Sequence, residues 1–284
     1  MTVVSKQFFE TEKIFGVSDY GIKEKSSSFL REPSSIIMFS GGIDSVSVLK
    51  RLLEETDEKI YTHHLHIKND EGKNNFKRYK AEAKALRKII PYMKKTFRDF
   101  HYTESTIDIR QIMNLLPAYY EKEDTEFTIL SYIPDQTFYS LIGGLLAKIT
   151  HSPNIYIGTC KEDYNSVGEN IAIWFEEEQK ENMDKITEGG ACPFKPKIQK
   201  PHDELTKKQN IEYLGKELMD MVWYCRHPIE KNGKILSCNT NLGIYKRGID
   251  LDTGEIFKCR SCRVVSDALI EIKEEETQRG IKYA

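Results

Sequence analysis

The sequence lacks any apolar run long enough to cross a membrane, since a spanning helix needs about 20 consecutive apolar residues and no stretch approaches that length. The first residues, MTVVSKQFFETEK, carry charges where a secretory signal needs an apolar core. Excess charge is also small, because 42 basic and 44 acidic residues leave a formal net charge of −2. These absences predict a cytoplasmic protein without a membrane partner, and they give no global sign of nucleic-acid binding.

From Ser35 onward, short apolar runs alternate with segments of helical periodicity. The run SIIMF at 35–39 is continuous and apolar, as expected of a strand that is buried on both faces. The stretch DSVSVLKRLLEE, soon after it, has its apolar residues on one helical stripe. Further strands are predicted at 59–67, 97–103 and 154–158, and helices at 74–90, 135–150, 169–185 and 206–216. This alternation predicts an α/β fold, a parallel sheet with helices on both faces.

The turn between the first strand and the first helix has a composition suited to a ligand. Gly41 and Gly42 let the backbone approach a ligand closely, and the N–H groups that open the next helix attract anions. Ser40 and Ser45 add hydroxyl donors, while the carboxylate of Asp44 fits beside phosphate when a cation such as Mg²⁺ screens both. The turn matches neither GxxxxGK[ST] nor G-x-G-x-x-G. A helix cap without a ligand is the alternative, and an anion site is the favoured interpretation.

The stretch SGGIDS at 40–45 resembles the pyrophosphate loop of the ATP pyrophosphatase (PP-loop) superfamily, which cleaves ATP between the α and β phosphates. Three later stretches narrow the resemblance: YIPDQTFYSLIGGLLAKI at 132–149, NIYIGTCKEDYN at 154–165, and ELTKKQNIEYLGKEL followed by WYC at 223–225. In this order they resemble segments of the 7-cyano-7-deazaguanine synthase family of the queuosine pathway. The resemblance extends from about Ser35 to Arg263, which is most of the chain.

The resemblance implies an adenine nucleotide alpha hydrolase-like domain and an ATP-dependent ligase that forms AMP and pyrophosphate. In the family, the carboxylate of a 7-deazaguanine attacks the α-phosphorus of ATP, ammonia displaces AMP to give an amide, and a second activation gives the nitrile. Asp44 and Ser45 are then catalytic, and His64 borders the adenine. ATP would bind to Ser40, Gly41, Gly42, Ile43, Asp44 and Ser45, and the substrate to Gln136, Glu162 and Asp163. Glu162 and Asp163 also follow the end of a strand, so they are candidates for the metal side of the site.

The chain departs from the family pattern around the expected substrate. The Arg-Asn of the family's second motif is Gln136-Thr137 here, and NSVGENIAIW stands where the family has an acidic segment with Cys-Arg. IKNDEGKNNF replaces the family's Tyr-Gly-Gln after the second strand. One alternative is therefore a PP-loop enzyme that adenylates a different acceptor, such as another modified base, tRNA, or a precursor in DNA modification or defence. A second alternative is a catalytically inactive nucleotide-binding partner protein.

Four of the six cysteines lie in the last 60 residues, which in a reducing cytosol indicates a metal site before disulfides. Four thiolates are enough for a closed, tetrahedral, structural Zn²⁺ site, and the family has a zinc knot with shorter spacing. The ligands would be Cys225, Cys238, Cys259 and Cys262. Buried cysteines without metal are the alternative, and His227 could replace one ligand. Cys160 and Cys192 are predicted to be ordinary buried thiols, and a catalytic cysteine has little support.

Two further features are assigned a structural role. The strand THHLH places His64 and His66 on one face and His63 on the other, and packed histidines are favoured over a metal site. Residues 68–98 contain eleven basic and only three acidic residues. That balance fits a nucleic-acid backbone, but a solvated outer face of a helix is the favoured interpretation.

We divide the chain into four parts: an N-terminal arm (1–30), a PP-loop ATP-binding α/β domain (31–220), a zinc-binding region (221–266) and a charged tail (267–284). The zinc-binding region is expected to contain an inserted hairpin within 239–258. The expected cofactors are ATP, Mg²⁺ and structural Zn²⁺, and the expected partners are a small-molecule carboxylate and ammonia. The sequence leaves open the oligomeric state, a homo-oligomer included, the source of ammonia, and whether the product enters tRNA or DNA.

Overall fold

The computed structural model describes residues 34–68, 73–108, 139, 142–147, 150, 152–165, 196–226, 228–238 and 259–279. Some of the predicted features lie outside the described residues. They are the N-terminal arm, Gln136, the helix at 169–185, Cys192, His227 and the hairpin in 239–258.

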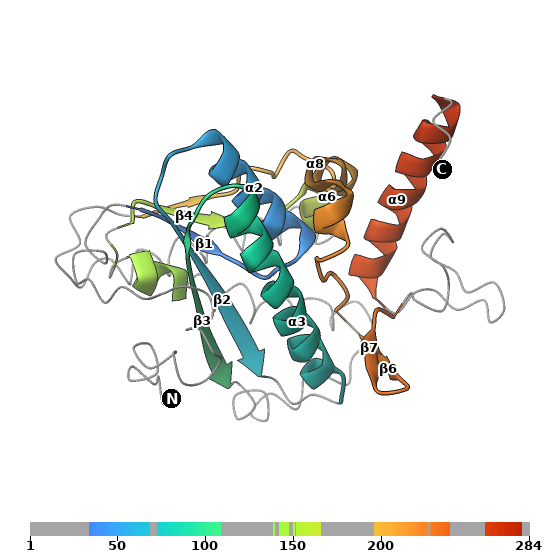
Figure 1. Cartoon of the computed structure of the whole chain (residues 1–284), viewed down its shortest axis with the longest axis horizontal. Helices are drawn as coiled ribbons and strands as arrows, with labels where there is room; N and C mark the ends of the chain where they lie inside the picture. Colours follow the sequence, from blue (N-terminus) through green and yellow to red (C-terminus); the bar gives the residue numbers. More distant parts are fainter. Residues whose placement is uncertain are drawn as a thin grey trace.

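Five parallel strands form the sheet that the sequence predicts, in the order β3-β2-β1-β4-β5 (Figure 1). They are β1 (Ser35–Met38), β2 (Ile60–Lys68), β3 (His101–Asp108), β4 (Asn154–Ile157) and β5 (Lys197–Gln199). β1 lies at the centre, with Ser35 opposite Ile60 of β2 on one side and Asn154 of β4 on the other. All four of its residues are buried, which explains why its sequence is not an alternation of apolar and polar residues.

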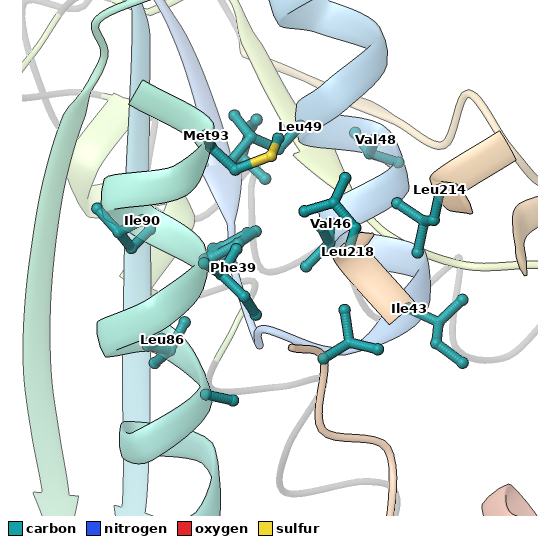
Figure 2. Packing of buried hydrophobic residues seen from close by; sticks show 14 of the residues in the cluster. Phe39, Ile43, Val46, Val48, Leu49, Leu86, Ile90, Met93, Leu214 and Leu218 are labelled. Carbon is teal, nitrogen blue, oxygen red and sulfur yellow. The ribbon is translucent and has the colours of Figure 1, made fainter. Parts of the chain in front are cut away.

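One face of the sheet is covered by α2 (Ile43–Glu55) and α3 (Lys73–Thr96), with α8 (Lys207–Met219) beside α2. Figure 2 shows the side chain of Phe39, the residue after β1, between the side chains of α3 and those of α2. Phe39, Val46 and Leu49 are fully buried. Each such side chain contributes about 1.5–3 kcal/mol to folding. The apolar core therefore fixes the end of β1 and the start of α2, between which the glycine turn lies.

The opposite face has a smaller core. Ile36 and Met38 of β1 and Ile155 of β4 pack there with Ala147, and Leu146 contacts the same cluster. Residues 142–147 are helical, so helices cover both faces of the sheet, as predicted. The alternation of β1 side chains between the two cores follows directly from the strand's period of two.

One predicted helix ends further along the chain than expected, and one predicted strand lies further along the chain than expected. α3 continues to Thr96 although it contains Pro91, because Pro91 is exposed while Ile90 and Met93 on the other side of the helix are fully buried. β3 begins at His101 and ends at Asp108, later than predicted, because it pairs with β2 from Tyr61 to Lys68.

The C-terminal part of the chain leaves the sheet. β6 (Ile229–Lys231) and β7 (Lys234–Leu236) form a hairpin, and the left-handed Asn232 and Gly233 between them fit a two-residue Asn-Gly turn. α9 (Arg260–Gln278) then runs alongside α8. The proposed boundary between 266 and 267 falls inside α9, so the cysteine region and the charged tail share one helix. Within the described ranges, none of the helices combines the length and apolar composition that a membrane span requires.

Candidate functional site

The sheet has its switch point between β1 and β4. β1 leads outward to β2 and β3 on one side, whereas β4 leads to β5 on the other. In open α/β sheets a crevice forms at this point, beyond the carboxyl ends of the strands. The glycine turn follows β1, and residues 158–163 follow β4. A pocket lies here, and its lining includes Ser40, Gly42, Asp44, Ser45, Asp163 and Lys207.

The glycine turn leaves the first turn of α2 open to a ligand. Gly41 has a φ of 74°, in the left-handed region, and a Cβ there would lie 2.9 Å from Leu86 Cδ2. Gly42 is the N-cap of α2, and no side chain caps the helix. The Ser40 and Ser45 hydroxyls are 3.0 Å apart. The structure brings together the N–H groups at the start of α2 and the two hydroxyls, a set of donors that suits an anion; anion binding at this turn stays a prediction.

Gly158 brings the loop after β4 against this helix start. A Cβ on Gly158 would lie 2.4 Å from the Ser45 backbone nitrogen and 2.6 Å from its Cα. Such distances are far below van der Waals contact, and the atoms involved are backbone. A glycine is therefore required at the junction between the two loops that line the pocket.

Asp44 is held by two side chains from α8. Lys207 Nζ lies 2.5 Å from Asp44 Oδ2, and Asn210 Nδ2 donates to Oδ1 at 3.1 Å. Asn210 is itself held by a hydrogen bond of 3.2 Å from the Ser47 hydroxyl to its Oδ1. Sequence reasoning missed Lys207 and Asn210, although both belong to a stretch that carries the family resemblance.

The charged side chains in this part of the pocket shift one another's pKa. Burial raises the pKa of Asp44; Lys207 and Asn210 oppose the shift, and Asp163 adds to it. Burial would lower the pKa of Lys207, but the carboxylates of Asp44 and Asp163 raise it above its ordinary value. Lys207 is therefore a permanent cation at neutral pH. The shift of Asp44 shows that its carboxylate would gain from a further cation.

Asp163 and Cys160 complete this group. Asp163 Oδ2 accepts hydrogen bonds from the backbone nitrogen of Cys160 at 3.1 Å and from its thiol at 3.3 Å. One ligand atom each of Asp44, Asp163 and Cys160 lie within 4.8 Å of one another. Two carboxylates suit Mg²⁺, which prefers oxygen ligands, so the residues present fit this ion. Burial, with Asp44 next, raises the pKa of the Cys160 thiol, which makes it a poor nucleophile.

Glu162 has a structural contact as well as a place in the pocket lining. It lies in α6 (Lys161–Asn165), and both of its carboxylate oxygens accept from the Lys207 backbone nitrogen at 2.9 Å. A carboxylate at the start of a helix is favoured by the helix dipole. Glu162 therefore places the first turn of α8, and with it the Lys207 side chain.

The four cysteines of the predicted knot come together. The sulfurs of Cys225, Cys238, Cys259 and Cys262 all lie within 4.8 Å of one another, and three of the four residues are buried. The backbone nitrogens of Arg226 and Cys238 point toward two of the sulfurs, each at 3.3 Å. Zn–S bonds of about 2.3 Å place the sulfurs of a tetrahedral site about 3.8 Å apart. The cluster therefore fits a single four-coordinate metal ion.

The knot also touches the phosphate-binding turn. The Trp223 backbone nitrogen donates to the Gly41 carbonyl at 3.3 Å, and the indole N–H donates to the Cys225 carbonyl at 2.8 Å. The lining of the pocket also includes Trp223, Tyr224, Arg226 and Ser261. The crevice thus has one wall from the sheet and one from the cysteine region.

The structure does not bring His64 into this site. His64 is fully buried in β2, where it contacts the Phe39 carbonyl and His66, and it is not among the pocket-lining residues. Its contact with adenine stays a prediction, as does the role of Gln136, which lies outside the described residues.

The parallel sheet, its switch point and the anion-binding turn after its first strand define an adenine-nucleotide-binding protein of the PP-loop type. The model of the family "Queuosine biosynthesis protein QueC" matches residues 34–273. The chain belongs to this family, which confirms the resemblance. The family supports an enzyme that acts with ATP by adenylation, on a small-molecule substrate and with ammonia.

Similarity to other proteins is more distant. None of the curated proteins matches this chain. Among solved structures, the chain is similar to the U34-tRNA thiolase NcsA from Methanococcus maripaludis with its [4Fe-4S] cluster, at 10% identity and a TM-score of 0.39, over 97% of this chain and 74% of that one. It is also similar to the NH3-dependent NAD synthetase from Campylobacter jejuni subsp. jejuni in complex with the nitrate ion, at 14% identity and a TM-score of 0.31, over 76% and 73% of the two chains.

Proposed function

We propose that the chain converts the carboxylate of a 7-deazaguanine to a nitrile through adenylate and amide intermediates, using ATP and ammonia. The observation that carries this proposal is the cluster at the start of α2, where Asp44, Lys207 and Asp163 meet open backbone N–H groups. This arrangement suits the pyrophosphate part of ATP. Its negative and positive side chains would act on the charge that moves during adenylation.

In the proposed first step, a substrate carboxylate oxygen attacks the α-phosphorus of ATP, and the bond from that phosphorus to the bridging oxygen breaks. Pyrophosphate leaves with the bonding electrons into the Ser40–Ser45 turn. Lys207 and the N–H groups of α2 neutralise its charge. Asp44 and Asp163 would hold Mg²⁺, which would supply charge screening for the phosphates. Ammonia then displaces AMP. No covalent side-chain nucleophile is needed, which agrees with the raised pKa of the buried Cys160 thiol.

The second wall suits the acceptor. Trp223 and Tyr224 are partly buried at the pocket, and aromatic rings of this kind pack well against a flat heterocycle. Four thiolates around one ion leave no open coordination position, so we assign Zn²⁺ in the knot a structural role: it holds this wall in place.

The direct experiment measures pyrophosphate release from Mg·ATP with 7-carboxy-7-deazaguanine and ammonium, followed by the mass of the product. A nitrile product is expected. Release with a different product, or only with another acceptor, would reassign the substrate. No release with any acceptor would favour an inactive nucleotide-binding protein.

Two variants test the cluster. Asp44→Asn and Lys207→Gln should each lower pyrophosphate release by at least about 100-fold, because each removes a charge that acts on the phosphates. Asp220→Asn is the matched control, because Asp220 is an exposed residue at the end of α8 that does not line the pocket. Unchanged release in Asp44→Asn would remove the turn from the mechanism.

A further inference from the structure

A continuous series of side-chain hydrogen bonds starts at the last carbonyl before the phosphate-binding turn. His64 Nδ1 lies 2.7 Å from the Phe39 carbonyl oxygen, and His64 Nε2 lies 3.0 Å from His66 Nδ1. His66 Nε2 lies 3.0 Å from Glu104 Oε2, and the Tyr102 hydroxyl donates to Glu104 Oε1 at 2.5 Å. Both histidines are at most 1% exposed. The family resemblance assigns only His64 a role, beside the adenine, and the proposed reaction does not use this series.

The hydrogen-bond partners determine where the protons lie. The Phe39 carbonyl can only accept, so His64 Nδ1 carries a hydrogen. A neutral His64 then has a bare Nε2, and His66 Nδ1 must donate to it. If His66 were also neutral, its Nε2 would carry no hydrogen and would face the Glu104 oxygen at 3.0 Å. Two hydrogen-bond acceptors would then be in contact, which is unfavourable. The series is therefore complete only with one additional proton between His66 and Glu104.

The hydrogen bonds to Glu104 favour its carboxylate form. Burial alone would raise the pKa of Glu104, but hydrogen bonds from His66 and Tyr102 reverse this and lower it below its ordinary value. Burial and the neighbouring His66 lower the pKa of His64 to about 4, so His64 remains neutral. Glu82 of α3 also acts on His64, and its carboxylate pairs with Arg78 at 2.7 Å. His63 lies on the opposite face of β2, and its lowered pKa keeps it neutral.

We propose that His64 is a positioning residue of the phosphate-binding turn, and that an imidazolium of His66 paired with Glu104 holds His64 in the tautomer that donates to Phe39. Phe39 is fully buried and directly precedes Ser40, so its carbonyl orientation sets the direction in which the turn begins. A buried carbonyl without a donor is unfavourable, and the backbone would turn to find one. The inference rests on the proposed binding of ATP to this turn.

The positioning role is tested with a matched pair of variants, His64→Asn and His64→Leu. The amide nitrogen of asparagine can take the place of Nδ1 and donate to Phe39, whereas leucine has a similar size and no donor. We expect His64→Asn to bind Mg·ATP nearly as tightly as the wild type in calorimetry, and His64→Leu on the order of tenfold more weakly. Urea unfolding of each variant checks that both are folded under the assay conditions.

Equal weakening in the two variants, or none in either, would overturn the positioning role while leaving ATP binding by the wild type intact. A wild type that binds no Mg·ATP would instead overturn the proposed function, and the positioning of an ATP site with it.

The proton is tested without ATP, by ¹⁵N NMR of the histidine ring nitrogens at neutral pH. We expect both ring nitrogens of His66 to carry hydrogen and His64 to be neutral with hydrogen on Nδ1. In Glu104→Gln the glutamine amide can donate to His66 Nε2, so His66 should become neutral. A bare nitrogen on His66 in the wild type would overturn the assignment of the proton.

Discussion

The two walls of the pocket are built in different ways. The wall that carries the phosphate-binding turn stands on the apolar core, where Ile37, Phe39 and Val46 are fully buried between sheet and helices. The other wall consists of residues 223–226 and the first turns of α9, and it rests on the cluster of four cysteines and on the hairpin that joins Cys225 to Cys238. A hairpin of two strands has little stability by itself. The first wall is thus determined by hydrophobic burial, whereas we propose that the second depends on a metal ion held by the four cysteines.

This difference determines which treatment should damage which wall. Removing a sulfur ligand or adding a chelator should affect the cysteine wall first, whereas a steric change in the sheet loops or a change in pH should affect the wall of the turn. The two walls meet where Trp223 donates to the Gly41 carbonyl. Substitutions on either side therefore test whether the walls fail separately.

The largest effect is expected for Cys259→Ser. This change removes one of four thiolates from a site whose metal contributes directly to folding, so bound zinc should fall well below one equivalent and the free energy of unfolding should drop by at least about 3 kcal/mol. Elemental analysis and urea unfolding measure the two quantities. A variant that keeps its full metal content would show that the ligand set is wrong.

A smaller but more local effect is expected for Gly158→Ala. Its methyl group would meet the Ser45 backbone, so the two loops must separate, which should cost about 3 kcal/mol of stability. A displacement of this kind at the phosphate site should lower ATP turnover about 100-fold, with the metal content unchanged. Turnover and metal are measured on the same sample.

Gly233→Ala is the control for that change. Unlike Gly158, Gly233 has a positive φ, 70°, and a Cβ there would meet nothing within 4 Å. Backbone strain alone should cost it about 1 kcal/mol and leave turnover unchanged. Equal loss of turnover in the two variants would mean that the contact between Gly158 and Ser45 does not determine the geometry of the turn.

Acid should weaken the core-built wall through His63. Burial, and next the neighbouring His64, lower the pKa of His63 from 6.5 to about 3. The folded state therefore holds the neutral form while the unfolded state takes up a proton, so the stability from this group is present above pH 6.5 and is lost as the pH falls toward 3. Between pH 7 and pH 5 the loss should be about 2 kcal/mol.

His63→Asn isolates this effect because asparagine cannot take up the proton and can still donate to Thr103. The quantity to compare is the change in unfolding free energy from pH 7 to pH 5 in each protein, not the absolute stability. The variant should lose about 2 kcal/mol less than the wild type. The same loss in both would mean that His63 is not kept neutral in the folded state.

Much of the core-built wall could be predicted from the sequence, because its signals are local. The apolar run of β1, the stripe of α2 and the glycine turn lie within about 20 residues of one another, and periodicity with turn chemistry is sufficient to place them. The grouping of the four cysteines was also predictable, since a C-x-x-C pair with two further cysteines is typical of a metal site.

The contacts that complete the site could not be predicted because they join distant segments. Lys207 and Asn210 reach Asp44 only through the packing of α8 against α2. The sequence shows that Gly158 follows a strand, but not that the Ser45 backbone lies against it. The alternation of the strand correctly placed His64 and His66 on one face, yet Glu104, the partner of His66, comes from β3.

The smallest effect is expected for Cys160→Ser, although Cys160 is fully buried and lies beside Asp44 and Asp163. It is neither in the cysteine cluster nor, with its raised pKa, a nucleophile. Serine keeps a hydrogen-bond donor toward Asp163, so the change should cost about 1 kcal/mol of stability and less than twofold in pyrophosphate release, with bound zinc unchanged. Loss of release with normal stability would show that the thiol takes part in the reaction. Loss of zinc would show that the two walls share a sulfur ligand, which would contradict their separate construction.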